Sequence, residues 1–198
     1  MSDITRKLKG PRSAAPALLV DDLKRRAAEQ DLMDVAYAPL DSPVGPLVVA
    51  ATRRGLVRIS YVYEDPEFVV EDLAARISPR VLEAPERLDD VRRELDEYFD
   101  GTRTNFDIAI DWRLTAGFTR KVLRATARVP YGSTSTYREV AGKAGSPRGS
   151  RAAGNALGSN PIPIVVPCHR ILHSGGGMGG YTGGLDKKIY LLNLEGAI

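Results

Sequence analysis

The spacing of apolar residues predicts a small α/β domain between residues 35 and 112. Two stretches of this region carry apolar residues at helical spacing, and Gly101 stands just beyond the second, as expected at a helix end. A later segment, Asn-Phe-Asp-Ile-Ala-Ile-Asp at 105–111, alternates polar and apolar residues and predicts a half-buried strand. The expected order is strands at 35–40, 46–51 and 55–62, helices at 66–77 and 88–99, and a strand at 105–111.

After residue 112 the pattern predicts helices. A basic amphipathic helix is expected over 115–129 and a last helix over 186–194. Between them, two short helices joined by a turn at Gly145, over 137–143 and 148–157, indicate a helix-turn-helix. The second of these is rich in Ala and Gly, so another backbone can approach it closely. Ahead of residue 35, residues 1–16 are expected to be flexible and 17–33 to form a helix.

Charge divides the chain in two. Residues 113–198 hold 12 Lys and Arg against three acidic residues, whereas residues 1–112 hold 16 against 22. A positive half that contains a helix-turn-helix favours DNA as the partner. A solvated basic surface without a partner is the alternative, and charge alone barely separates the two.

Composition narrows the class of protein. The chain has 198 residues, 43% of them hydrophobic, and one cysteine. No stretch of 18 apolar residues occurs and residues 1–10 lack a signal-peptide core, so a protein of the reducing cytoplasm is expected, with no membrane association. A lone thiol forms no intramolecular disulfide and cannot supply a multi-thiolate zinc site.

The candidate chemistry lies around this cysteine. Cys168 stands in Pro-Cys-His-Arg after the apolar run 162–166, and with His169 alone it fits a buried spectator better than a nucleophile. Downstream, residues 174–184 contain seven glycines but lack the Gly-Lys-Ser/Thr ending of a phosphate-binding loop. Residues 35–111 hold no Cys or His, which predicts a structural role for them.

Three motifs carry a family resemblance. They are Asn-Pro-Ile-Pro-Ile-Val-Val-Pro-Cys-His-Arg at 160–170, Gly-Tyr-Thr-Gly-Gly at 180–184 and Leu-Leu-Asn-Leu-Glu-Gly at 191–196. Together they resemble the methylated-DNA–protein-cysteine methyltransferases, the O6-alkylguanine-DNA alkyltransferase family. The similarity runs from about Phe118 to Gly196; the N-terminal half matches only in its coarse pattern. It implies an α+β fold: a small RNase H-like α/β domain (35–112) and a mostly helical, winged-helix-like domain with the helix-turn-helix (113–198). Residues 1–34 have no counterpart in the minimal family core and are expected to be an N-terminal extension with a helix.

The resemblance also implies a function, which is direct-reversal DNA repair. Such a protein binds duplex DNA through the minor groove and flips out O6-alkylguanine, with O4-alkylthymine as a wider substrate. It then transfers the alkyl group to Cys168 as a stable thioether. Each molecule acts once, no cofactor or metal is needed, and a monomer is expected, with cooperative binding on DNA left open.

Family motifs assign the chemical roles residue by residue. Cys168 resembles the alkyl acceptor, and His169 the base that acts on it through a bridging water, a link that an extended segment would favour. Glu195 would orient His169, although by itself it reads as a surface carboxylate at a helix end. Tyr137 would donate a hydrogen bond to the flipped guanine, its alternative being a packed aromatic.

The substrate and DNA contacts follow in the same way. Asn160 matches the residue that ties the helix-turn-helix to the acceptor segment, and the carbonyls of Val166 and Cys168 would bind the guanine amino group. Tyr181 and Thr182 would line the alkyl pocket, where many family members carry serine in place of Thr182. Arg170 is expected to hold neighbouring loops.

On the DNA side, Arg151 resembles the arginine that fills the gap left by the base. The close approach to the minor groove is assigned to Ala152, Ala153 and Gly154, and phosphate contacts to Arg148 and Arg120.

Two rival functions stay open at this point. A cysteine hydrolase or acyltransferase could use N–H groups of the glycine-rich loop as an oxyanion hole. A non-catalytic DNA-binding regulator is the second, but alkyltransferase-like relatives carry another residue at the cysteine position, and Cys168 is present here.

Overall fold

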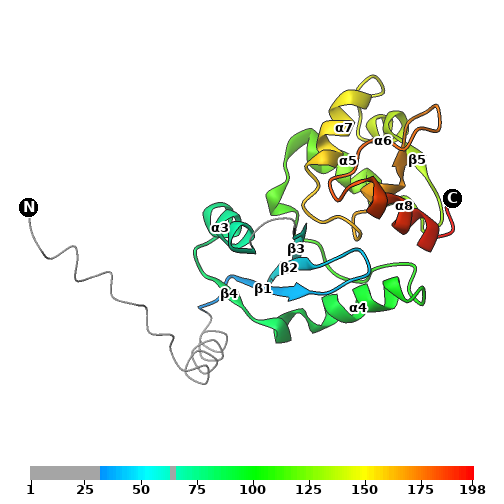
Figure 1. Ribbon diagram of the computed structural model, residues 1–198. Helices are drawn as coiled ribbons and strands as arrows, with labels where there is room; N and C mark the ends of the chain where they lie inside the picture. Colours follow the sequence, from blue (N-terminus) through cyan, green and yellow to red (C-terminus); the bar gives the residue numbers. More distant parts are fainter. Residues whose placement is uncertain (1–31, 63–65) are drawn as a thin grey trace, which may run out of the picture. The chain divides into compact units, whose positions relative to one another are not determined.

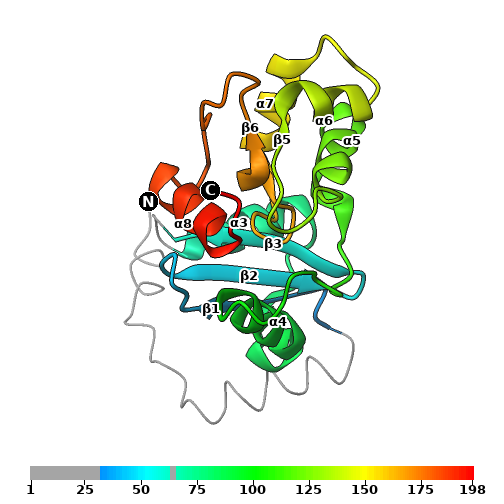
Figure 2. The same ribbon diagram turned by 90° about the vertical axis from the view of Figure 1, so that its right-hand side faces the viewer.

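The structure is a computed structural model that describes residues 32–62 and 66–198. Residues 34–198 form one compact unit. The predicted flexible stretch at 1–16 and almost all of the helix predicted over 17–33 lie outside the described residues. Within the compact unit, Figures 1 and 2 show a sheet half (residues 34–111) next to a helical half (residues 112–198).

The sheet half is built on four strands in the order β3-β2-β1-β4. β1 (Val35–Leu40), β2 (Leu47–Thr52) and β3 (Gly55–Tyr61) form an antiparallel meander, which confirms the three strands predicted first. β4 (Val81–Glu83) runs parallel to β1 and was missed, because three residues are too short to show an alternating pattern.

The strand predicted over 105–111 is wrong. This segment makes a single parallel bridge to the outer edge of β3, between Leu56 and Ile110. The bridge depends on Gly55, whose φ is +128°. A Cβ at Gly55 would lie 2.0 Å from the carbonyl oxygen of Ala109, so only glycine allows so close an approach. The alternation of polar and apolar residues reports half-burial here without a continuous ladder.

Two helices cover opposite faces of the sheet. α3 (Pro66–Arg76) packs Val69 and Leu73 against one face, together with Val48 of β2. After the 3-10 turn η1 (Pro85–Leu88), α4 (Asp89–Phe99) packs against the other face, which includes Val49. The core beneath α4 continues into the helical half, so the two halves share one apolar interior.

The helical half confirms the four predicted helices: one has the predicted bounds, two are shorter than predicted, and the last begins one residue earlier. After η2 (Trp112–Leu114) come α5 (Gly117–Thr126), the two-residue strand β5 (Ser135–Thr136), α6 (Tyr137–Lys143) and α7 (Ser150–Gly158). The chain then forms η3 (Cys168–Arg170), β6 (Ile171–Leu172) and α8 (Leu185–Leu194). Thr136 and Glu139 form a capping box that fixes the start of α6. β5 pairs with β6, which places the start of α6 beside the chain that leaves Cys168.

The apolar run 162–166 is buried but is not a strand, so the extended conformation that would favour a water-bridged Cys168–His169 link is not adopted here. Ile164 has φ +74°, alone among the described non-glycine residues in being positive, and the segment closes in turns before η3. Prolines at 161, 163 and 167 remove three of the N–H donors that a ladder would need. The turns hold Cys168 at the start of η3 instead.

Candidate active site

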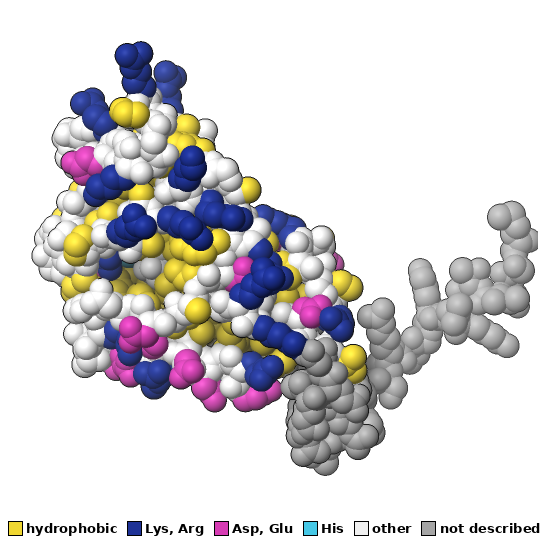
Figure 3. All heavy atoms as spheres, turned by 180° about the vertical axis from the view of Figure 1, so that it is seen from behind, with side chains coloured by type: hydrophobic (Ala, Val, Ile, Leu, Met, Phe, Trp, Pro, Cys, Tyr) yellow, Lys and Arg dark blue, Asp and Glu magenta, His cyan; other side chains and the backbone are white. Residues whose placement is uncertain are grey.

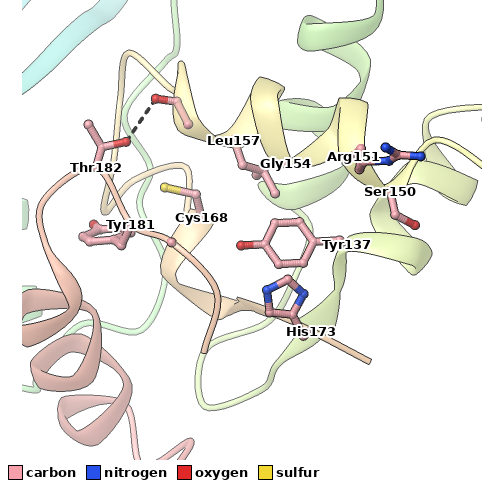
Figure 4. Close-up of a pocket in the computed structure, with 11 residues that line it drawn as sticks. Tyr137, Ser150, Arg151, Gly154, Leu157, Cys168, His173, Tyr181 and Thr182 are labelled. Carbon is pink, nitrogen blue, oxygen red and sulfur yellow. Dashed lines mark hydrogen bonds between the residues drawn. The ribbon is translucent and has the colours of Figure 1, made fainter. Parts of the chain in front are cut away.

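Cys168 lies in a cavity of about 670 Å³ between the helix pair α6–α7 and the glycine-rich loop. Tyr137, Arg151 and Gly154 line it on one side, and Tyr181 and Thr182 on the other (Figure 4). Only 6% of Cys168 is exposed. The thiol is therefore buried in the protein yet borders a cavity into which a ligand could fit.

The surroundings of Cys168 keep its thiol protonated. Burial raises the pKa of the Cys168 thiol to about 11, although the hydrogen bond from Asn160 and the charge of Lys188 act in the opposite direction. Forming the thiolate at pH 7 then costs on the order of 5 kcal/mol. A nucleophilic role therefore requires a nearby group that accepts the proton.

His169 is placed to be that group. Its side chain is fully buried, and Nε2 lies 2.8 Å from Oε1 of Glu195. Burial lowers the pKa of His169, whereas Glu195 raises it; the net shift is downward, so the ring is neutral near pH 7. The carboxylate can only accept, so Nε2 carries the proton and donates a hydrogen bond to Glu195. Nδ1 is then a lone-pair acceptor, and it has no hydrogen-bond partner among the described residues.

Glu195 is buried and ionised. Burial alone would raise its pKa, but hydrogen bonds from His169, Arg170 and Tyr98 outweigh burial and lower the pKa from 4.5 to about 2. Arg170 donates from Nε to Oε2 at 2.8 Å and from Nη2 to Oε1 at 2.9 Å, and its Nη1 donates to the carbonyl of Val129. The structure thus gives Glu195 the place beside His169 that the motif assigned, and rules out a surface carboxylate.

Asn160 connects the end of α7 to residues 162–168, the segment that holds Cys168. Its Nδ2 donates to the carbonyl of Val166 at 2.8 Å and to Sγ of Cys168 at 3.1 Å, and its Oδ1 accepts from the N–H of Ile162. The predicted tie to the backbone is present, and the bond to sulfur is an addition that the sequence did not indicate.

The glycine-rich loop supplies the other wall. Tyr181 lies edge-on to His169, with ring centroids 6.3 Å apart, and its hydroxyl is 2.7 Å from that of Tyr61 on β3. Thr182 donates from Oγ1 to the carbonyl of Gly158 at the end of α7, at 3.1 Å. This bond, dashed in Figure 4, joins the loop to the helix pair across the cavity edge.

Tyr137, the first residue of α6, faces the cavity from the opposite side (Figure 4). Burial and the nearby Cys168 raise its pKa, so it is a neutral phenol that can donate. Its ring packs against His173, with centroids 5.0 Å apart. His173 is exposed and also lines the cavity.

The comparison with known proteins settles the family. Residues 35–112 match the family described as 6-O-methylguanine DNA methyltransferase, ribonuclease-like domain, and residues 117–197 match its DNA-binding domain. A methylated-DNA–protein-cysteine methyltransferase of Methanosarcina acetivorans is 37% identical over 161 residues, covering 81% of this chain and 98% of that protein. The chain belongs to the methylated-DNA–protein-cysteine methyltransferase family.

Other members of the family agree in sequence and in fold. The methylated-DNA–protein-cysteine methyltransferase of Mycolicibacterium paratuberculosis is 40% identical over 161 residues, which is 81% of this chain and 92% of that protein. The crystal structure of Mycobacterium tuberculosis OGT in complex with DNA has a TM-score of 0.71 and 34% sequence identity, covering 82% of this chain and 93% of that chain. The α+β fold expected for a methyltransferase of this family is therefore confirmed.

The surface of this methyltransferase is basic around the helix pair. Figure 3 shows Lys and Arg side chains over the upper part of one face and Asp and Glu along its lower edge. Arg148 and Arg151 are exposed, as is Ala152, and Gly154 is half-buried at the cavity. Ala153 is fully buried in the core, so its predicted place on the DNA-facing surface is wrong: it lies on the inner face of α7.

Arg120 is also placed differently from the prediction. Its guanidinium donates to the backbone carbonyls of Thr115 and Trp112, and its side chain is part-buried. These bonds hold the entry to α5, which is a structural role, whereas the sequence indicated a phosphate contact.

Tyr98 is the site residue that sequence reasoning missed. It donates to Oε1 of Glu195 at 2.6 Å from α4, in the sheet half of the methyltransferase. In the sequence, Tyr98 is one of the apolar residues at helical spacing in the predicted helix 88–99, and nothing local connects it to a carboxylate 97 positions away.

Within residues 32–62 and 66–198 no group of three or more His, Cys, Asp or Glu side chains could hold a metal ion. Over the same part of the chain, no helix combines the length and apolar character needed to cross a membrane.

Proposed function

We propose that this chain repairs O6-alkylguanine in duplex DNA by moving the alkyl group from the base to Sγ of Cys168, once per molecule. One observation carries the proposal. His169, which directly follows the lone cysteine in the chain, is fully buried and neutral; its Nε2 is fixed by Glu195, and its Nδ1 has no partner in the part of the chain that the structure describes. Family membership and a relative crystallised with DNA support the substrate.

Proton transfer comes first. A water held between Sγ and Nδ1 of His169 would pass the thiol proton to the ring, as the unpartnered buried nitrogen suggests. Glu195, kept ionised by Arg170 and Tyr98, stabilises the imidazolium that forms. The raised pKa of Cys168 falls once this counter-charge exists, because opposite charges favour the ionised form.

Alkyl transfer follows. The thiolate attacks the alkyl carbon, the S–C bond forms, and the C–O6 bond breaks with its electron pair moving to the guanine. The phenol of Tyr137 donates a proton to the departing base, and the imidazolium returns a proton toward Tyr137 through solvent, so the overall exchange is alkyl for hydrogen. Water does not cleave a thioether under these conditions, so Cys168 is consumed. O4-alkylthymine presents the same type of bond and is proposed as a second substrate.

The same proposal places the DNA on the outer face of α7. Arg151 would enter the base stack, Ala152 and Gly154 would face the minor groove, and Arg148 would contact phosphate. The flipped base would enter the cavity, with its amino group on the carbonyls of Val166 and Cys168 and its alkyl group between Tyr181 and Thr182. We assign these tasks to residues 113–198 and a supporting role to residues 35–112, and we regard residues 1–34 as an N-terminal extension. All the groups named belong to one chain, so a monomer suffices.

The test is one incubation. Duplex DNA with a single O6-methylguanine is mixed with an excess of protein, and intact protein mass is measured for the wild type and for Cys168→Ser. The wild type should gain one methylene mass per molecule and the variant none, with unmodified duplex as the control. Repeated turnover with excess DNA, or tight binding with no loss of the lesion, would contradict the proposal.

The same samples separate the rival functions. Steady hydrolysis of an ester or amide substrate would favour the cysteine hydrolase. Binding without any change in protein mass would favour the DNA-binding regulator.

A further inference from the structure

Glu195 is the point at which the two halves of the molecule meet in the site. Its Oε1 accepts three hydrogen bonds, from the hydroxyl of Tyr98 at 2.6 Å, Nε2 of His169 at 2.8 Å and Nη2 of Arg170 at 2.9 Å. Arg170 and His169 come from η3, whereas Tyr98 comes from α4 in the sheet half. The sheet half therefore contributes one of the three donors on the oxygen that holds His169.

Tyr98 is held in place by its ring. The side chain is fully buried, and its ring packs edge-on against Phe99 and Tyr131 and at a tilt against Phe106, with centroids 5.3–6.1 Å apart. Burial, together with the negative charge of Glu195, raises the pKa of Tyr98 far above 10. The hydroxyl is therefore protonated at every physiological pH and acts as a fixed donor.

A fixed third donor has two effects on the carboxylate. It restricts Glu195 to the orientation in which Oε1 faces His169, since rotation would break a short charge-assisted bond. It also takes up part of the negative charge on Oε1, which would otherwise act on the imidazole alone. Both effects act on His169 without contact between Tyr98 and the substrate cavity.

We propose that Tyr98 is a positioning residue of the alkyl-transfer reaction, which sets the orientation of Glu195 and the strength with which Glu195 holds His169. The proposal rests on the proposed function of Cys168 as alkyl acceptor. It gives the sheet half, which carries no cysteine or histidine, a defined part in the chemistry.

Other groups near Glu195 and His169 remain in place when the Tyr98 hydroxyl is removed. The charged and titratable neighbours are Arg170 of η3, Lys188 of α8, Tyr131 ahead of β5, Tyr181 of the glycine-rich loop and Cys168 itself. A change in the behaviour of His169 in a Tyr98→Phe variant would therefore report the lost hydroxyl.

The experiment compares Tyr98→Phe with Tyr131→Phe. Tyr131 belongs to the same aromatic cluster, but its hydroxyl donates to the backbone carbonyl of Leu194 at 3.0 Å and not to Glu195. Single-turnover transfer from an O6-methylguanine duplex is measured between pH 5.5 and 9, with the folded state of each variant checked by thermal unfolding.

For Tyr98→Phe we expect the transfer rate at its plateau to fall about tenfold, the loss of one hydrogen bond to a charged group. The acidic limb of the pH–rate profile should move by about one unit to higher pH, because a less neutralised carboxylate favours the imidazolium. Tyr131→Phe should retain the wild-type limb. Affinity for the lesion duplex should be unchanged in both variants.

Site-specific 3-fluorotyrosine at position 98 gives a second test that keeps the shape of the side chain. The more acidic phenol donates more strongly, so the acidic limb should move to lower pH. An acidic limb at the same pH in the wild type, Tyr98→Phe, Tyr131→Phe and the 3-fluorotyrosine protein would overturn the proposal. Failure of the wild type to transfer a methyl group would instead overturn the proposed function, and the two failures are therefore distinguishable.

Discussion

The ion pair between Arg170 and Glu195 allows a quantitative prediction of stability. Both side chains are nearly fully buried, and two N–H groups of the guanidinium donate to the two carboxylate oxygens at 2.8 and 2.9 Å. Arg170→Met keeps the length and apolar stem of the side chain but removes the only cation that contacts Glu195 in the described part of the chain. The carboxylate is then buried with two neutral donors, Tyr98 and His169.

Removing one partner of a buried pair costs about 3–5 kcal/mol, because the remaining charge keeps its desolvation penalty. For a folded unit of this size that loss lowers the thermal midpoint by about 10 °C. The difference in stability between the wild type and Arg170→Met should shrink as the pH falls from 6 toward 3. In the variant Glu195 has lost its cation and gains a proton over this range, whereas in the wild type its pKa is about 2.

The assay is thermal and urea unfolding of unreacted protein at several pH values. Arg93→Met is the matched control: Arg93 pairs with Asp90 and Glu97 on the exposed face of α4, and its loss should hardly change the midpoint. The double variant Arg170→Met, Glu195→Gln should lose less free energy of unfolding than the sum of the losses in the two single variants. A midpoint for Arg170→Met equal to that of Arg93→Met would refute the reasoning.

Four further variants test the site and the basic surface. Because the pKa of Glu195 is lowered to about 2, its contribution to stability is present above pH 4.5 and is lost as the pH falls toward 2. In urea unfolding, Glu195→Gln should lack this acid-dependent part of the stability. Parallel plots of the free energy of unfolding against pH for wild type and variant would contradict this prediction. Thr182→Ser keeps the hydroxyl that donates to Gly158 and removes a methyl from the cavity wall. It should raise the rate of benzyl relative to methyl transfer in single-turnover assays, and an unchanged ratio would count against the alkyl-pocket assignment. Arg148→Ala should reduce the salt dependence of DNA affinity by about one phosphate contact. Arg120→Ala should leave that slope unchanged and lower the midpoint of unfolding, because its guanidinium bonds backbone carbonyls; the opposite pattern would restore the phosphate contact first expected.

The outcome of sequence reasoning depended on how local each signal was. Apolar spacing was sufficient for strands and helices of six or more residues, and failed for the three-residue β4. The alternation at 105–111 wrongly predicted a strand, because a segment that contacts a sheet edge at one bridge shows the same alternation as a paired strand. In the helix pair, composition identified small residues but not the helix face they occupy. Ala153 was therefore predicted on the DNA-facing surface, although it is buried.

The residues of the candidate site differ in the same way in how far the sequence identifies them. Cys168 and His169 are neighbours in sequence, and the resemblance to the family's motifs brought in Asn160 and Glu195, which the structure places beside them. Tyr98 could not be found in this way. Its hydroxyl reaches Glu195 only because α4 packs across the face of the sheet that continues into the helical half, a tertiary arrangement with no signature in either segment.

The burial of Cys168 also bears on how the protein survives before it meets damaged DNA. Peroxides and soluble electrophiles attack thiolates, and their attack follows the thiolate fraction and the exposure of the sulfur. A thiol with a pKa of about 11 and 6% exposure offers little of either at neutral pH. The acceptor role proposed for Cys168 needs an intact thiol, and burial shields this thiol from oxidation to sulfenic acid.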